Sequence, residues 1–389
     1  MFVFVCAGCD AELTAPLSQV ALPVHAHQQY GNGLQLPVLM EPGTFAVEPE
    51  PWGPPWRRPE ETGPDEAAAH GVHGPVHALS GGVPGPIVIA PGDTRGAVLI
   101  PEKRGGACCG LAGGDGPNMA CAACGLPVAS RIDDCSLWQA VWLAPGAVRP
   151  LPVEADDAGP LSWAELMAEG KGVPPFEPIT SWASLFGASD RWHWSPQWVA
   201  AAGQALAHLL AASEGRAVAV PDGLASEMFR RDLDALLPAG PPARRAVFAG
   251  PGLSAPDADA RILLVPSHPR TGEVWAPRTG DARTPAASAY PVPLPFGVWL
   301  RLVFPEPELP VPASRLMPED VLRDDPPAPA VHDVFRIDQH VFWHTLARLP
   351  AVRRPWLAEI LAPLTPHPRA GTFQSADEGL RDPGPCPVL

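Results

Sequence analysis

The chain has 389 residues, 46% of them hydrophobic, so it can bury a sizeable core; at about 150 residues per domain this length suggests two domains. Its formal net charge of −15, without a long basic run, argues against nucleic-acid binding, since an acidic surface repels phosphate backbones. No apolar run reaches the ~18 residues needed to span a membrane. The apolar start, Met1 to Val5, is short and lacks a basic segment, so we expect no signal peptide and a cytoplasmic location.

The first part of the chain, residues 1–153, is predicted to be a β-rich domain. Pro91 to Arg95 is rich in turn formers, and we expect it to join two of the strands, 86–90 and 96–100, as a hairpin. Residues 41–82 are dense in Pro, Gly, Glu and His without periodicity, and they predict a loop-rich insertion. The chain is proline-rich, with 54 prolines, which indicates rigid, irregular connections. Short apolar runs predict strands at 2–5, 18–24, 36–40, 86–90, 96–100 and 137–143.

The second part, residues 154–389, is predicted to be an α/β domain with C-terminal helices and a loose tail after 366. Ser162 and Glu165 have the spacing of a capping box, which opens a helix at Trp163. Strands and helices alternate over 216–265, which favours a small α/β unit and an α+β class for the whole chain. Further helices are predicted at 197–213, 226–237, 338–349 and 355–364, and strands at 216–220, 245–249, 261–265 and 297–304.

Two Cys-x-x-Cys pairs are the most informative motif. Cys6 and Cys9 form the first pair, and Cys121 and Cys124 form the second. Two thiolates at this spacing can bind one tetrahedral Zn²⁺ from a tight turn, and the small residues between them let backbone amides point at the sulfurs. In a reducing compartment such pairs are more often metal ligands than disulfides. We therefore predict one structural Zn²⁺ held by these four cysteines.

Both pairs resemble the knuckles of the zinc-ribbon family, in which two turns carried by hairpins clamp one zinc ion. The resemblance covers the knuckles alone and implies neither a reaction nor a partner. It departs from the family in one respect, because 111 residues separate Cys9 from Cys121, against the usual ~12–20. A zinc ribbon here would contain a large insertion between its two halves.

Three further cysteines, Cys108, Cys109 and Cys135, surround the second knuckle in sequence, and Cys386 stands alone in the tail. The three could form a second metal site, replace the first knuckle in the zinc site, or be redox-active. The acidic residues directly before Cys135 disfavour its thiolate, which argues against an activated nucleophile.

His340 and His344 lie four residues apart on a predicted helix. This spacing is similar to half of the His-Glu-x-x-His metalloprotease motif, but residue 341 is Val, so the general base is missing. We expect the two histidines to bind no metal and the helix to pack through Phe342 and Trp343.

No phosphate-binding loop, dinucleotide-binding glycine turn or Gly-x-Ser-x-Gly elbow occurs in the chain. We therefore interpret it as a soluble zinc-binding protein with an interaction or scaffold role and an unidentified protein partner. One alternative is an enzyme with its site in the α/β half or at the Cys108–Cys135 cluster. The other is nucleic-acid binding through the ribbon, which the net charge disfavours.

Overall fold

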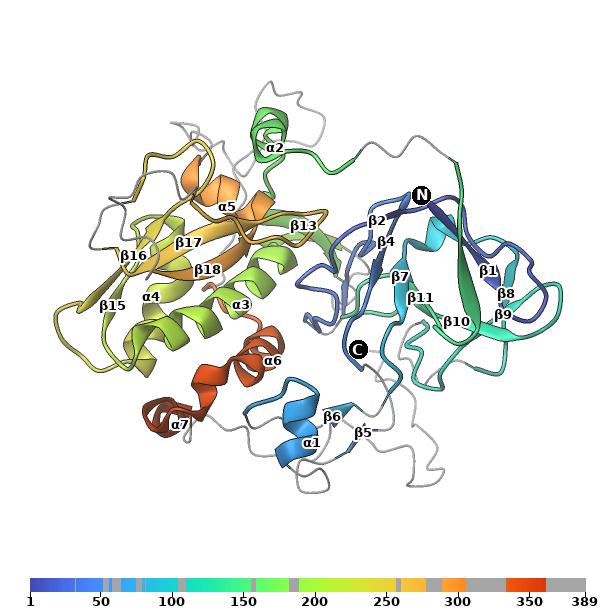
Figure 1. Cartoon of the computed structure of the whole chain (residues 1–389), viewed down its shortest axis with the longest axis horizontal. Coiled ribbons are helices and arrows are strands. Elements are labelled where there is room, and N and C mark those ends of the chain that lie inside the picture. Colours follow the sequence, from blue (N-terminus) through green and yellow to red (C-terminus); the bar gives the residue numbers. More distant parts are fainter. Residues whose placement is uncertain are drawn as a thin grey trace.

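The chain forms a β-rich lobe and an α/β lobe that lie side by side (Figure 1). Most helices belong to the second lobe, and the fold class is α+β, as the sequence predicts. No helix among the described parts is long and apolar enough to cross a membrane. The computed structural model describes residues 1–31, 33–51, 56–57, 64–74, 79–80, 82–103, 110–154, 159–181, 189–256, 260–277, 289–305 and 334–361.

The β-rich lobe is organised around a seven-stranded sheet with the order β2-β4-β7-β11-β10-β9-β8. Beside it, β1 and β12 pair antiparallel from Phe2↔Pro152 to Cys6↔Val148, which fixes the start of the chain against a segment far along the sequence. Residues 1–153 contain the strands β1 (Phe2–Cys6), β2 (Ser18–Gln19), β3 (Leu34–Gln35), β4 (Thr44–Val47), β5 (Trp56–Arg57), β6 (Leu79–Ser80), β7 (Ile87–Ile89), β8 (Ala97–Leu99), β9 (Met119–Cys121), β10 (Pro127–Ile132), β11 (Ala140–Leu143) and β12 (Val148–Pro152) and the helix α1 (Pro64–Ala69). β5 and β6 pair with each other and lie with α1 apart from the seven-stranded sheet (Figure 1).

The predicted hairpin between 86–90 and 96–100 does not form. Instead, β7 pairs with β4 and β11, whereas β8 pairs with β9. The connection contains a short 3-10 helix, Pro91–Asp93, and then runs along the N-terminal segment. There the amide of Arg95 donates to the carbonyl of Leu13 at 2.7 Å. Turn-forming residues thus redirect the chain between two parts of one sheet instead of reversing it.

Residues 41–82 contain more regular structure than the predicted loop-rich insertion. β4 lies inside the seven-stranded sheet, between β2 and β7, and its Phe45 is buried in the core. β5, β6 and α1 follow within the same stretch. β4 could not be predicted from the sequence because its four residues are too few to show an alternation of apolar and polar side chains.

The α/β lobe contains a parallel sheet with the order β15-β16-β17-β18 and a smaller antiparallel sheet in which β13 pairs with β14 and with β3 of the other lobe. Its strands are β13 (Phe176–Ser181), β14 (Ser189–Trp194), β15 (Val218–Ala219), β16 (Arg244–Phe248), β17 (Ile262–Ser267) and β18 (Tyr290–Pro295). Its helices are α2 (Trp163–Glu169), α3 (Pro196–Ser213), α4 (Leu224–Leu236), α5 (Phe296–Val303), α6 (Gln339–Arg348), a 3-10 helix (Pro350–Arg353) and α7 (Pro355–Leu361). The end of the predicted helix 355–364 and the tail after 366 lie outside the described residues.

Helix α3 is the central element of this lobe. Its Ala/Leu-rich sequence leaves only a narrow polar stripe, and it is buried on nearly all sides because the sheet and α6 pack against it. Gly203 permits the close approach of α6, since a Cβ there would lie 2.5 Å from the carbonyl oxygen of Asp338. Trp198 is fully buried, and its indole N–H donates to the carbonyl of Val173 at 2.9 Å.

The predicted strand at 297–304 is wrong, because this segment is helix α5. β18 precedes it and supplies the edge strand of the parallel sheet. In β18, prolines alternate with Val292 and Leu294, which are fully buried. Proline lacks an N–H and is tolerated at such an edge, where no neighbouring strand needs the donor. An apolar run as short as 297–304 has no periodicity that separates strand from helix.

A short segment, residues 25–30, lies between the two lobes. Its first residues, 25–27, lie in a turn. Gln28 is buried there: its side-chain amide donates to the carbonyl of Pro196 at 3.0 Å and accepts from the indole of Trp138 at 3.2 Å. These contacts join the α/β lobe to the β-rich lobe through one polar side chain.

Candidate metal centre

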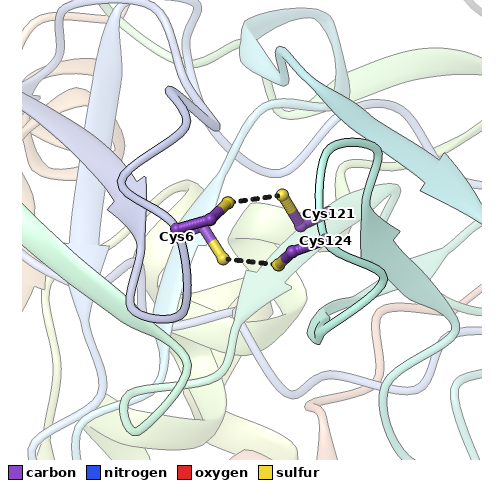
Figure 2. Close-up of side chains that lie close together, drawn as sticks. Cys6, Cys121 and Cys124 are labelled. Atoms are coloured by element: carbon purple, nitrogen blue, oxygen red, sulfur yellow. Dashed lines mark hydrogen bonds between the residues drawn. The ribbon is translucent and has the colours of Figure 1, made fainter.

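Four cysteines from two distant segments meet at one point of the β-rich lobe. The Sγ atoms of Cys6, Cys9, Cys121 and Cys124 all lie within 4.8 Å of one another. Across the two turns, the Sγ atoms of Cys6 and Cys124 are 3.6 Å apart, and so are those of Cys9 and Cys121. Figure 2 shows the thiols of the two turns pointing toward one another. The four sulfurs are close enough to bind one metal ion.

Each cysteine pair lies in the turn between two antiparallel segments. The first turn joins β1 to the residues after it, which run back along β1 through the bridges Val5↔Glu12 and Phe2↔Leu17. The second turn joins β9 to β10, which pair as a hairpin. The strands therefore fix the direction from which each pair of sulfurs approaches the centre.

The two turns have the same backbone geometry. In both, the backbone amide of the residue after the second cysteine donates to the carbonyl of the first cysteine. The amide of the first cysteine in turn donates to the carbonyl of the residue two positions after the second cysteine. These bonds measure 3.0 and 2.9 Å in the first turn and 2.8 and 2.8 Å in the second. The residue after the second cysteine has a positive φ in both turns, +63° at Asp10 and +77° at Gly125. One local motif thus occurs twice and presents its sulfurs to a shared point.

Backbone amides and neighbouring thiols control the protonation of the sulfurs. Burial raises the pKa of Cys121, but amides of its own turn and the thiols of Cys9 and Cys6 outweigh burial and lower it to about 7. For Cys9, the amide of Ala11 lowers the pKa, but the surrounding thiols raise it to about 12. One thiolate therefore forms easily, and the next ones are opposed by the charge already present. A divalent cation removes that opposition, so metal binding would release protons.

The four sulfurs differ in exposure. Cys6 and Cys121 are buried and pack in the core of the lobe, whereas Cys9 and Cys124 are exposed. Gly8 lies inside the first turn, where a Cβ would meet the sulfur of Cys124 at 3.5 Å, an ordinary contact. The centre is thus anchored on its inner side and open to solvent on its outer side.

The remaining cysteines are not part of this group as far as the structure describes them. Cys135 is buried, and its backbone amide donates to the side chain of Asp134 at 3.0 Å. Cys108, Cys109 and Cys386 lie outside the described residues. The structure thus brings together the four cysteines that the spacing predicts.

His340 and His344 stack on one face of α6, with ring centroids 6.4 Å apart, while Phe342 packs in the core as predicted. The Nε2 atom of His344 lies 3.6 Å from a carboxylate oxygen of Glu50, which is also paired with Arg348. Burial and nearby cationic groups lower the pKa of His344 to about 3, so its ring is neutral at ordinary pH.

This contact between α6 and the segment after β4 is a network that the sequence reasoning missed. Glu50 and Arg348 are 298 residues apart, and no local pattern connects them. Nearby, the Nε2 atom of His27 lies 2.5 Å from a carboxylate oxygen of Glu48. Among the described residues, only the four cysteines bring three or more potential ligand atoms within 4.8 Å of one another. We therefore interpret this network as a link between the lobes.

The carboxyl edge of the parallel sheet, where α/β proteins usually bind ligands, is covered by α2 and its flanks. Trp163 of α2 packs edge-on against His268, which directly follows β17. The Nε2 atom of His268 lies 2.8 Å from the carbonyl of Leu161, and the amide of Val173 donates to the carbonyl of Gly297 at 3.0 Å. The chain itself occupies this edge, which gives the enzyme alternative no support there.

No protein-family model, curated protein or solved structure matches this chain, so the assignment of the metal centre rests on its own geometry.

Proposed function

We propose that the chain binds one Zn²⁺ through Cys6, Cys9, Cys121 and Cys124 and that this metal is structural. The observation that carries the proposal is the convergence of four thiols within 4.8 Å from two turns of the same geometry. Tetrahedral sites made of four sulfurs favour zinc or iron. With four protein ligands no coordination position remains for water or substrate, which is the arrangement of structural zinc.

The long separation between the turns does not oppose this assignment. The thiols of Cys9 and Cys121 are 112 positions apart, but the entropy of loop closure grows only by about 0.6 kcal/mol per doubling of loop length. Zinc–thiolate binding contributes roughly 10 kcal/mol or more in small zinc domains. The pairing of β1 with β12 also draws the first turn into the lobe without help from the metal.

Metal analysis of the purified chain tests the proposal. We expect about one zinc per chain, and a colourless protein, because a four-sulfur iron site absorbs visible light. Cys6→Ser and Cys121→Ser should each abolish stoichiometric zinc binding and lower the melting temperature. Cys135→Ser is the matched control, since it also replaces a buried cysteine of the same lobe but should leave the metal content unchanged. Loss of zinc in Cys135→Ser with retention in Cys6→Ser would refute this ligand set.

We further propose an interaction or scaffold role in the cytoplasm, with a protein partner. Two observations support this role over catalysis: four protein ligands leave no open coordination position on the metal, and the carboxyl edge of the parallel sheet is covered. The net charge of −15 supports the same role over nucleic-acid binding. An anisotropy titration at physiological salt should show no tight binding to DNA or RNA. Submicromolar affinity that falls steeply with salt would favour nucleic-acid binding instead.

A further inference from the structure

We propose that the four-cysteine centre is also a thiol switch, in which a peroxide oxidant links Cys6 to Cys124 and Cys9 to Cys121 and releases the zinc. This inference rests on the proposed zinc binding and adds a regulation of the same site. It specifies disulfides between the two turns and not within each Cys-x-x-Cys motif.

The distances support pairing between the turns. In each of the two pairs, the Sγ atoms are 3.6 Å apart. A disulfide bond of about 2.05 Å therefore requires the two sulfurs of each pair to approach by ~1.5 Å. The two pairs share no atom, so both bonds can form in one molecule.

In each pair, the difference in exposure assigns one sulfur to react with the peroxide and the other to form the disulfide. Each pair joins one exposed thiol, Cys9 or Cys124, to one buried thiol, Cys121 or Cys6. In the proposed zinc-bound state all four sulfurs are thiolates, so access decides which of them peroxide oxidises, and the exposed sulfur reacts first. The buried partner, already in contact, is placed to attack the oxidised sulfur.

The chemistry balances for each pair. The Cys9 thiolate attacks one oxygen of the peroxide, the O–O bond breaks, and Cys9 becomes a sulfenic acid as water leaves after protonation. The Cys121 thiolate then attacks the Cys9 sulfur, the S–S bond forms, the S–O bond breaks, and a second water leaves after protonation. A second peroxide oxidises Cys124, and Cys6 forms the second disulfide in the same way. Overall, four thiolates lose four electrons, two peroxides and four protons become four waters, and the zinc ion departs unchanged in charge.

The two disulfides would replace the metal as the connection between the turns. Each bond closes a loop of more than a hundred residues, from Cys6 to Cys124 or from Cys9 to Cys121. Bonds that close long loops restrict the unfolded chain most. Bonds within a turn would close loops of only a few residues and leave the turns unconnected. The oxidised lobe should therefore stay folded while it releases its zinc.

The test uses the full chain with Cys108, Cys109, Cys135 and Cys386 replaced by Ser, so that only the four ligands remain. Its zinc content is measured first, and the protein is then treated with hydrogen peroxide in the presence of a chromogenic zinc chelator. Disulfides are mapped by mass spectrometry of non-reduced peptides. We expect release of all bound zinc, the two links between the turns, and recovery of zinc binding after reduction with dithiothreitol.

A matched variant and a stability measurement separate the outcomes. With Cys124→Ser added, only the Cys9–Cys121 link should form. The oxidised protein should melt above the reduced protein stripped of zinc, which a pairing within the turns would not produce. A protein without zinc before oxidation would refute the proposed function. A zinc-loaded protein that forms links within the turns, or that keeps its zinc under peroxide, would overturn the switch alone.

Discussion

Gly125→Ala tests whether the geometry of the second knuckle is under backbone constraint. Gly125 has φ +77°, and a Cβ there would meet no atom within 4 Å, so the substitution changes backbone energy without a clash. A left-handed conformation costs a non-glycine residue ~1–2 kcal/mol, and the smaller entropy of the unfolded alanine variant offsets ~0.4–1 kcal/mol of that cost. We expect a net loss of about 1 kcal/mol in the free energy of unfolding, or a factor of about five in the folding equilibrium.

Urea denaturation of the zinc-loaded protein measures this loss, with Gly146→Ala as the matched control. Gly146 also lies in a turn of the β-rich lobe and also has no atom near its Cβ position, but its φ is not positive. The control should be neutral or slightly stabilising. If Gly125→Ala costs no more than Gly146→Ala, the two knuckles do not share the constraint inferred here. At the corresponding position of the first knuckle, Asp10→Gly should change stability in the opposite direction.

Three further changes test the packing and the protonation of the core. In Gly250→Ala, the new Cβ would lie 2.2 Å from the ring of Trp299, so overpacking should destabilise the fold by ~1–3 kcal/mol in urea denaturation; an unchanged midpoint would contradict the tight contact. Gln28→Leu removes the polar bridge between the lobes and leaves the indole of Trp138 without its acceptor, which should cost ~1–3 kcal/mol by the same assay. Burial lowers the pKa of His208 to about 4. Protonation of His208 therefore favours the unfolded state. The stability that the neutral ring contributes is complete above pH ~6.5 and is lost as the pH falls toward 4. The free energy of unfolding changes in this window with a slope of up to ~1.4 kcal/mol per pH unit. His208→Gln should flatten the pH dependence of stability in this window, and an unaltered curve would show that other groups cause it.

Helices were predicted best because their signals are local. Ser162 and Glu165 form the complete capping box that their spacing suggests, and the Ala/Leu-rich run after Ser195 forms α3, from Pro196 to Ser213. The residues that start and end a helix belong to one short segment, so the local sequence contains most of the information that determines where a helix forms. The exceptions are α5, an apolar run too short to show periodicity, and α1, a six-residue helix inside the predicted loop-rich insertion.

Strand pairing was predicted poorly because partners are chosen across the chain. Nothing in β7 or β8 indicates that their partners are β4, β11 and β9, and nothing in Phe2–Cys6 identifies Val148–Pro152 as its neighbour. The cluster of four cysteines was predictable despite its long separation, because two pairs of sulfurs complete one tetrahedral shell. No comparable rule of coordination number links Glu50 to Arg348, so their contact could not be predicted from the sequence.

The pairing of the first strand with β12 has a consequence for synthesis on the ribosome. Cys6 and Cys9 emerge first, but Cys121 follows 112 positions after Cys9. At about 5–20 residues per second, the nascent chain carries the thiols of Cys6 and Cys9 for roughly 6 to 22 s before the other ligands exist. The partner of β1, Val148–Pro152, arrives later still. During that interval the four-cysteine metal site is incomplete and β1 cannot pair with β12. The β-rich lobe therefore completes its fold only once residues 148–152 have left the exit tunnel.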